Sequence, residues 1–153
     1  MAAGTFTLYD SVAELIGDGT LDLDTHPFKI VQLTSVYTPS AAHSVYADLT
    51  NELATANGYT AGGGTLTTVT YTQTGGVATF DSDNFVWTAS GGPITARYGV
   101  IYDDTPTTPL VDPLIGYYLL DSAPADVTAT DGNTFTVGPN AANGWFQTTV
   151  NPV

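Results

Sequence analysis

Hydrophobic and polar residues alternate with a period of two along most of this chain. The alternation is clearest in residues 5–9 (TFTLY), 66–72 (LTTVTYT) and 77–81 (VATFD). Threonine, valine and aromatic side chains fill these segments, and such side chains suit a pleated, half-buried surface. The pattern predicts β-strands there, with further strands at residues 85–88, 94–102, 114–120, 134–137 and 145–150.

Glycine, proline and short polar residues separate the predicted strands. Gly75 and Gly76 lie between two alternating segments and predict a two-residue hairpin turn. The sequences SGGP, DDTPTTP, DSAPAD and TDGN are equally typical of turns. Short strands at this spacing predict a mainly β chain, folded as an antiparallel β-sandwich of the jelly-roll or immunoglobulin-like type with one or two short helices.

Two segments depart from the alternation and predict the helices. Residues 11–16 (SVAELI) begin with Ser11 as N-cap, and Glu14 completes a capping box. Residues 40–53 (SAAHSVYADLTNEL) place apolar side chains at helical spacing and form the stronger candidate. The glycine content of residues 55–65 (TANGYTAGGGT) predicts a mobile loop. A phosphate-binding loop is disfavoured there, because the segment lacks the lysine and the strand-to-helix setting that such a loop needs.

Length and charge narrow the class of protein. A chain of 153 residues suits one domain, residues 1–153, with a core of its own. Fifteen acidic residues and two basic ones give a net charge of −13, and such a surface repels the phosphates of nucleic acids. There is no cysteine, and no apolar run approaches the roughly 18 residues that cross a membrane. We therefore expect a soluble protein without nucleic-acid or membrane partners.

Residues with catalytic potential are sparse. His26 and His43 are the two histidines, and the sequence has no GxSxG nucleophile turn. We therefore expect no catalytic residue, no cofactor and no metal, and a protein that is not an enzyme. Acids do occur in close pairs, and a D-x-D pair suits calcium or glycoside chemistry. The pairs do not continue into the EF-hand pattern, so solvated turn acids are the favoured interpretation over adventitious calcium; they are Asp22/Asp24, Asp81/Asp83 and Asp103/Asp104.

The two basic residues are candidate contact residues. Arg97 lies within the predicted strand 94–102, on the face opposite Tyr98, with Gly99 beside it leaving space for another chain. A guanidinium pairs well with a carboxylate, and the chain has fifteen of these. We expect Arg97 to form a structural or intersubunit salt bridge, and Lys29 to do the same more weakly.

Several blocks carry a family resemblance, in the order GTFTLYDS, GDGTLDLDT, FKIVQLTSVYTPS, ITARYGVIYDDT, PLIGYYLLD and ADVTATDGNTFTV. From Gly4 to about Val137 the chain resembles small proteins encoded by tailed bacteriophages and prophages among their virion structural genes. The last residues, VGPNAANGWFQTTVNPV, depart from the closing strand of that group. The group supplies no catalytic residue to carry over.

The resemblance implies a virion structural protein, and a capsid decoration (cement) protein is the expected function. Its partners would be the major capsid protein and copies of itself, as homotrimers at three-fold positions on the capsid surface. Aromatic residues are favoured interface anchors. The candidates are Tyr9, Tyr37, Tyr59 and Trp145, together with Trp87 and Tyr98, for which core packing is the alternative.

Two other functions stay open at this point. A tail-tube, neck or fibre component would also suit an acidic chain, with residues 55–65 as a loop that inserts into a neighbour. A carbohydrate-binding or carbohydrate-cleaving β-sandwich would use Trp87 or Trp145 as a stacking platform with an acid pair nearby.

Overall fold

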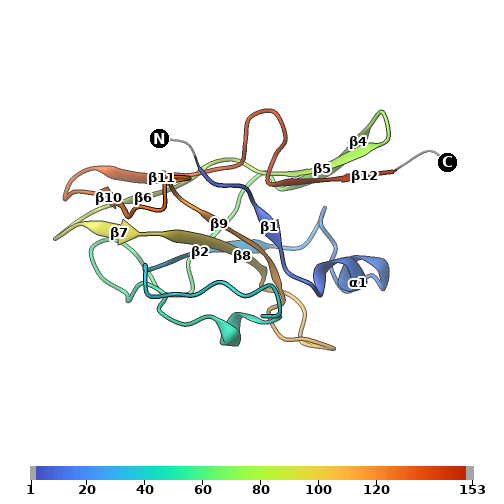
Figure 1. Ribbon diagram of the computed structural model, residues 1–153, viewed down its shortest axis with the longest axis horizontal. Helices are drawn as coiled ribbons and strands as arrows, with labels where there is room; N and C mark the ends of the chain where they lie inside the picture. Colours follow the sequence, from blue (N-terminus) through green and yellow to red (C-terminus); the bar gives the residue numbers. More distant parts are fainter. Residues whose placement is uncertain (1–2, 151–153) are drawn as a thin grey trace.

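The computed structural model describes residues 3–150, and Figure 1 shows one large sheet with smaller sheets packed over it. The large sheet is antiparallel, with the strand order β1-β9-β8-β2-β3. Its central strands are almost continuously buried, because other segments cover both of its faces. Its strands are β1 (Thr7–Leu8), β2 (Phe28–Leu33), β3 (Gly64–Thr65), β8 (Tyr98–Asp103) and β9 (Leu114–Leu119).

The other strands form a three-stranded sheet, β12-β5-β4, and two strand pairs, β10-β7 and β11-β6. Their bounds are β4 (Thr70–Thr74), β5 (Val77–Asp81), β6 (Phe85–Thr88), β7 (Ile94–Ala96), β10 (Val127–Ala129), β11 (Thr134–Val137) and β12 (Phe146–Thr149). The helical elements are α1 (Val12–Gly17) and a single 3₁₀ turn, η1 (Tyr46–Asp48). Within residues 3–150, neither is long or apolar enough to cross a membrane.

One face of the large sheet is lined by tyrosines, and we call it the tyrosine face. Residues 34–62 cover it with chain that is mostly irregular, and Figure 1 shows this cyan-to-teal segment beneath the sheet. Tyrosines pack there in pairs, with ring centroids 4.8 to 5.7 Å apart. The pairs are Tyr46 on Tyr102, Tyr9 on Tyr117 and Tyr37 on Tyr98.

The opposite face is lined by phenylalanines, and we call it the phenylalanine face. The three-stranded sheet lies over it, above the large sheet in Figure 1. Phe28 meets Phe80 edge to face at 5.0 Å, and Phe80 packs on Phe146 at 5.3 Å. Apolar side chains from two sheets therefore interdigitate here, as in a β-sandwich.

The structure confirms the mainly β, sandwich-like fold. The strands predicted at residues 77–81, 85–88 and 134–137 have these same bounds. Gly75 and Gly76 join β4 to β5 with positive φ values of 61° and 86°, which is the conformation that a two-residue hairpin turn requires. Strands β2, β3 and β10 were not among the predicted segments, and β3 lies at the end of the predicted loop 55–65.

The predicted helix at residues 40–53 is wrong. Only η1 is helical there, and the rest is held by bonds to other segments: Tyr46 N donates to Asp112 O, and Leu114 N donates to Ser44 O. The Asp48 carboxylate accepts hydrogen bonds from the backbone N–H groups of Ser44 and Val45. These long-range and side-chain bonds satisfy the backbone in place of a helix.

Helix α1 confirms the first predicted helix but not its capping box. Ser11 already has helical backbone angles, with φ −73° and ψ −18°, and its side chain makes no capping bond. A turn precedes the helix, since Val12 N donates to Tyr9 O. In that conformation Ser11 behaves as a helical residue, so its hydroxyl does not cap the helix.

Candidate functional site

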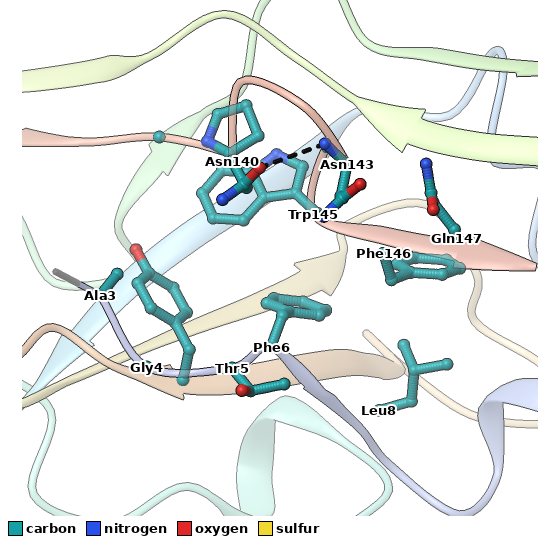
Figure 2. Close-up of a pocket in the computed structure, with 14 residues that line it drawn as sticks. Ala3, Gly4, Thr5, Phe6, Leu8, Asn140, Asn143, Trp145, Phe146 and Gln147 are labelled. Carbon is teal, nitrogen blue, oxygen red and sulfur yellow. Dashed lines mark hydrogen bonds between the residues drawn. The ribbon is translucent and has the colours of Figure 1, made fainter. Parts of the chain in front are cut away.

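A cleft of about 730 Å³ opens between the N-terminal strand and the segment that leads into β12. Residues 3–6 and Leu8 form one wall, and residues 138–140 and 143–147 form the other. We call it the aromatic cleft. Figure 2 shows Phe6 below Trp145 and beside Phe146.

Phe6 is at the centre of an aromatic cluster. Its ring is partly exposed and lies 6.2 Å from the nearly parallel ring of Phe146, 5.8 Å from Trp145 and 6.0 Å from Tyr118. Gly116 makes room for it, because a Cβ atom at that position would come within 2.3 Å of the Phe6 ring. The absent side chain in β9 therefore seats the ring that lines the cleft.

Amide side chains surround the cluster. Asn140 Oδ1 accepts hydrogen bonds from the backbone N–H groups of Ala142 and Asn143, and Figure 2 marks the second bond. Gln147 Nε2 donates to Thr79 at 3.1 Å. The Asn140 bonds leave its amide nitrogen free to contact a ligand, whereas the Gln147 side chain pairs with Thr79 on the outer face of the three-stranded sheet, opposite Phe146.

Buried polar atoms lie beneath the cleft on the phenylalanine face. Gln32, Gly99 and Tyr118 occupy directly opposed positions in β2, β8 and β9, so their side-chain positions share this face. The side-chain amide of Gln32 and the hydroxyl of Tyr118 are buried without a hydrogen-bond partner in the protein. Burial raises the pKa of Tyr118, which keeps it a neutral hydroxyl.

Arg97 does form a salt bridge, and it lies within the chain. Its Nε is 2.8 Å from Asp126 Oδ1. The predicted strand 94–102 is wrong as one continuous element, because it breaks at Arg97 into β7 and β8, which join different sheets. The predicted space beside Gly99 is also absent: a Cβ atom there would come within 2.6 Å of the Tyr118 ring.

Lys29 is likewise paired within the chain. Its Nζ is 2.7 Å from Asp104 Oδ2, and both side chains are about one-third exposed. The two basic residues of the sequence thus neutralise nearby acids of the same chain. Neither is left as a free cation for an anionic ligand.

Burial of the predicted aromatic anchors corrects the interface interpretation. Tyr9, Tyr37 and Tyr59 are each 2% exposed, and Trp145 is 6% exposed. They are core residues, which leaves little side-chain surface for a partner. Trp87 is 6% exposed and packs in the core, which is the alternative expected for it. Tyr98 is half-buried.

The buried tyrosines bind the covering segment to the tyrosine face. Tyr37 Oη is 3.2 Å from Tyr9 Oη and 3.1 Å from His43 Nδ1. Burial is the main cause that raises the pKa of Tyr9 and Tyr37. This chain of hydrogen bonds gives His43 a structural role.

Glu52 is the second centre of hydrogen bonding on that face. Its carboxylate accepts bonds from Tyr46 Oη, from Tyr59 Oη at 2.7 Å and from Gly62 N at 2.7 Å. Burial and the bond to Glu52 raise the pKa of Tyr46 to about 12. Glu52 thereby fixes the glycine-rich loop of residues 55–65 against the sheet.

His26 pairs with a buried acid. Its Nδ1 is 2.6 Å from Asp103 Oδ2, and the Asp103 side chain is fully buried. Burial raises the pKa of Asp103, and the hydrogen bond from His26 opposes that effect. A histidine oriented by a carboxylate can act as a base, but neither residue lines the aromatic cleft.

The acid pairs are engaged in local structure. Asp22 accepts bonds from Asp24 N, Thr25 N and Thr25 Oγ1, and these bonds lower its pKa. Asp83 Oδ2 accepts a bond from Thr68. Across residues 3–150, no group of three or more His, Asp or Glu side chains is placed to hold a metal ion.

No family model, curated protein or solved structure matches this chain. The geometry of the aromatic cleft is therefore the only basis for assigning it a ligand. Sequence reasoning singled out Trp145 but missed Phe6, the central ring. Two signals point to it: the alternation TFTLY puts Phe6 and Leu8 on one face, and Gly116 interrupts an otherwise bulky strand.

Proposed function

We propose that this chain is a structural protein of a bacteriophage virion, and specifically a capsid decoration protein that stabilises the head lattice. The sequence blocks described above support the virion assignment by their resemblance to phage structural proteins. The observation that carries an assembly role is the chemistry of the open sheet edges.

The three-stranded sheet ends in uncharged strands on both sides. Strand β4 (TYTQT) pairs with β5 alone, and so does β12 (FQTT). The β4 edge is partly occupied, because Tyr71 N donates to Asp24 Oδ1 at 3.4 Å, so β12 is the more open edge. Proteins that stay monomeric commonly protect such edges with lysine, other charges or proline. The single lysine of this chain lies instead on β2, inside the large sheet. Edges of this kind are suited to pairing with another chain.

Charge supports contacts through these edges. The net charge is −13, and both basic residues are paired within the chain. Charged surfaces of two copies repel one another, so contacts between copies, including the proposed homotrimer, are expected at uncharged strands. A major capsid protein with a basic surface would be attracted. On this proposal the strand edges, and not the buried tyrosines, form the interface.

The tail-tube alternative is less favoured by the geometry. It uses residues 55–65 as a free loop that inserts into a neighbouring subunit. In the structure Glu52 binds both Tyr59 and Gly62 of this loop, and Tyr102 Oη donates to Gly62 O. A loop held by these bonds is not free to extend without breaking them.

Copy number in purified virions tests the proposal first. Quantitative mass spectrometry against the major capsid protein should give a ratio near one or a simple fraction of it. A handful of copies would move the protein to the neck or fibres. Absence from virions would reject the virion function.

A proline on the β12 edge tests how the protein binds. Val150 N donates to Gly76 O, so the N–H of the neighbouring Thr149 points away from β5. Thr149→Pro removes that outward donor, while the control Thr149→Ala keeps it. Binding to undecorated capsids should fall at least tenfold for the proline variant alone. Equal binding by both variants would reject the edge as the contact.

A further inference from the structure

We propose that the aromatic cleft binds a neutral carbohydrate, with the Phe6 ring as its platform and the surrounding amides as its hydrogen-bonding groups. This function is additional to the proposed virion role and does not depend on it.

Charge excludes several ligand classes. The cleft of about 730 Å³ has the size of a small-molecule site. Among the residues that the structure describes, none that lines the cleft is charged. An anionic ligand would find no cation there and would be repelled by the net charge of −13. A cationic ligand would find no carboxylate. A neutral ligand remains.

The rings give the ligand an apolar surface to lie against. Phe6 is the partly exposed member of the cluster, and Trp145 and Phe146 support it from the other wall. The C–H face of a sugar ring is apolar and can pack flat on an aromatic face. Trp87, the other platform suggested by the sequence, packs on Phe85 instead and does not line this cleft.

The amides give the ligand its polar partners. Asn140 and Asn143 line the cleft and are exposed. Each amide group offers both donors and acceptors, which match hydroxyl groups that also do both. A purely aliphatic ligand would leave these groups without partners. Aromatic and amide groups together therefore favour a polyhydroxylated ligand.

Buried polar atoms under the cleft lack hydrogen-bond partners in the protein. Tyr118 lines the cleft, yet its hydroxyl has no partner in the protein. The Gln32 amide lies on the same face beyond Gly99 and is equally unpartnered. Buried polar groups are nearly always hydrogen-bonded. A water molecule held beneath the sugar would satisfy them.

The test begins with binding of the full chain to an array of neutral and acidic oligosaccharides, followed by calorimetry with the neutral ones that bind. Phe6→Leu keeps an apolar side chain but removes the aromatic face, and Asn143→Ala removes an exposed amide of the cleft. Each variant should weaken binding about tenfold or more. The control Gln73→Ala removes an exposed amide from β4 and should bind like the wild type.

Two results would overturn the proposal. The first is that no neutral oligosaccharide binds at millimolar concentration, or that acidic ones alone bind. The second is that a neutral oligosaccharide binds equally well to all variants, because the ligand would then lie elsewhere. Thermal unfolding of each variant confirms that an observed loss of binding is not a loss of folding.

Tyr118→Phe tests the buried anchor separately. The hydroxyl has no partner in the protein, so its removal should leave thermal stability unchanged or raise it, while affinity falls. A fall in stability with unchanged affinity would show that the hydroxyl serves an internal water of the fold. That result would overturn its role in the carbohydrate site.

Discussion

The two faces of the large sheet are covered in different ways, and their aromatic residues differ accordingly. Irregular chain covers the tyrosine face, where Tyr37 and Tyr59 of that chain bind through their hydroxyls to Tyr9 and to the backbone N–H of Gln32. A second sheet covers the phenylalanine face, where Phe28 and Phe80 make apolar contacts. A sheet satisfies its own backbone, whereas irregular chain needs side chains to do so. The type of covering layer therefore decides which aromatic residue suits each face.

The aromatic cleft lies on the phenylalanine side, at the margin where the covering sheet ends. Packing there depends on absent side chains at Gly99 and Gly116. Two of the three buried side chains that have no hydrogen-bond partner within residues 3–150, Gln32 and Tyr118, are on this same face. We therefore expect the removal of a hydroxyl or carboxylate group to lower the free energy of unfolding on the tyrosine face. On the phenylalanine face, added side-chain volume should lower it.

The largest effect is expected from Glu52→Ala on the tyrosine face. Three donors lose their acceptor, and one of them, Tyr59, is buried. The free energy of unfolding should fall by about 3 kcal/mol. Chemical denaturation measures this, with exposed Glu14→Ala as the control for the lost negative charge. Equal stability of the two variants would contradict the role given to Glu52.

Gly99→Ala should produce the next largest effect, on the opposite face. Its Cβ would come within 2.6 Å of the Tyr118 ring, so the free energy of unfolding should fall by about 2 kcal/mol. Gly17→Ala, where a Cβ meets nothing within 4 Å, is the control and should be nearly neutral. In a Tyr118→Leu background the cost of the Gly99 substitution should shrink. An unchanged cost would place the strain elsewhere.

The same substitution on the two faces gives the most direct comparison. Tyr37→Phe removes a hydroxyl bonded to both Tyr9 and His43 and should cost about 1 kcal/mol. Tyr118→Phe removes a hydroxyl that has no partner and should cost nothing. Both are measured by urea denaturation. Similar costs for the two variants would mean that the faces do not differ in the way described.

The smallest effect concerns the pH dependence of Asp48. Bonds from the N–H groups of Ser44 and Val45 lower its pKa, so the ionised form stabilises the fold. This contribution is complete above the unfolded pKa of about 3.9 and is lost as the pH falls through the lower folded value. Asp48→Ala should cost about 0.5 kcal/mol at pH 7, because the group is exposed, and the cost should diminish below about pH 4. Denaturation at a series of pH values measures it, and a cost that grows on acidification would contradict this assignment.

Local patterns in the sequence were sufficient to predict strands that lie directly beside a tight turn. Residues 77–81 alternate strictly and follow Gly75 and Gly76, whose positive φ values only glycine adopts without strain. Neighbouring residues thus determined β5 and its hairpin. The same holds for the short helix after Tyr9, although its capping was not predictable from Ser11 alone. Composition also showed that each of the two basic residues had abundant acidic partners.

Tertiary structure decided the rest. Residues 40–53 have helical spacing, yet contacts with distant strands hold them in another conformation. Arg97 fits an uninterrupted strand by alternation, but the chain changes sheets there. A tyrosine in a sequence is equally suited to a surface or to a core in which its hydroxyl finds a partner. Tyr9, Tyr37 and Tyr59 became core residues because Glu52, His43 and one another supply those partners, and these residues meet only when the sheet is covered.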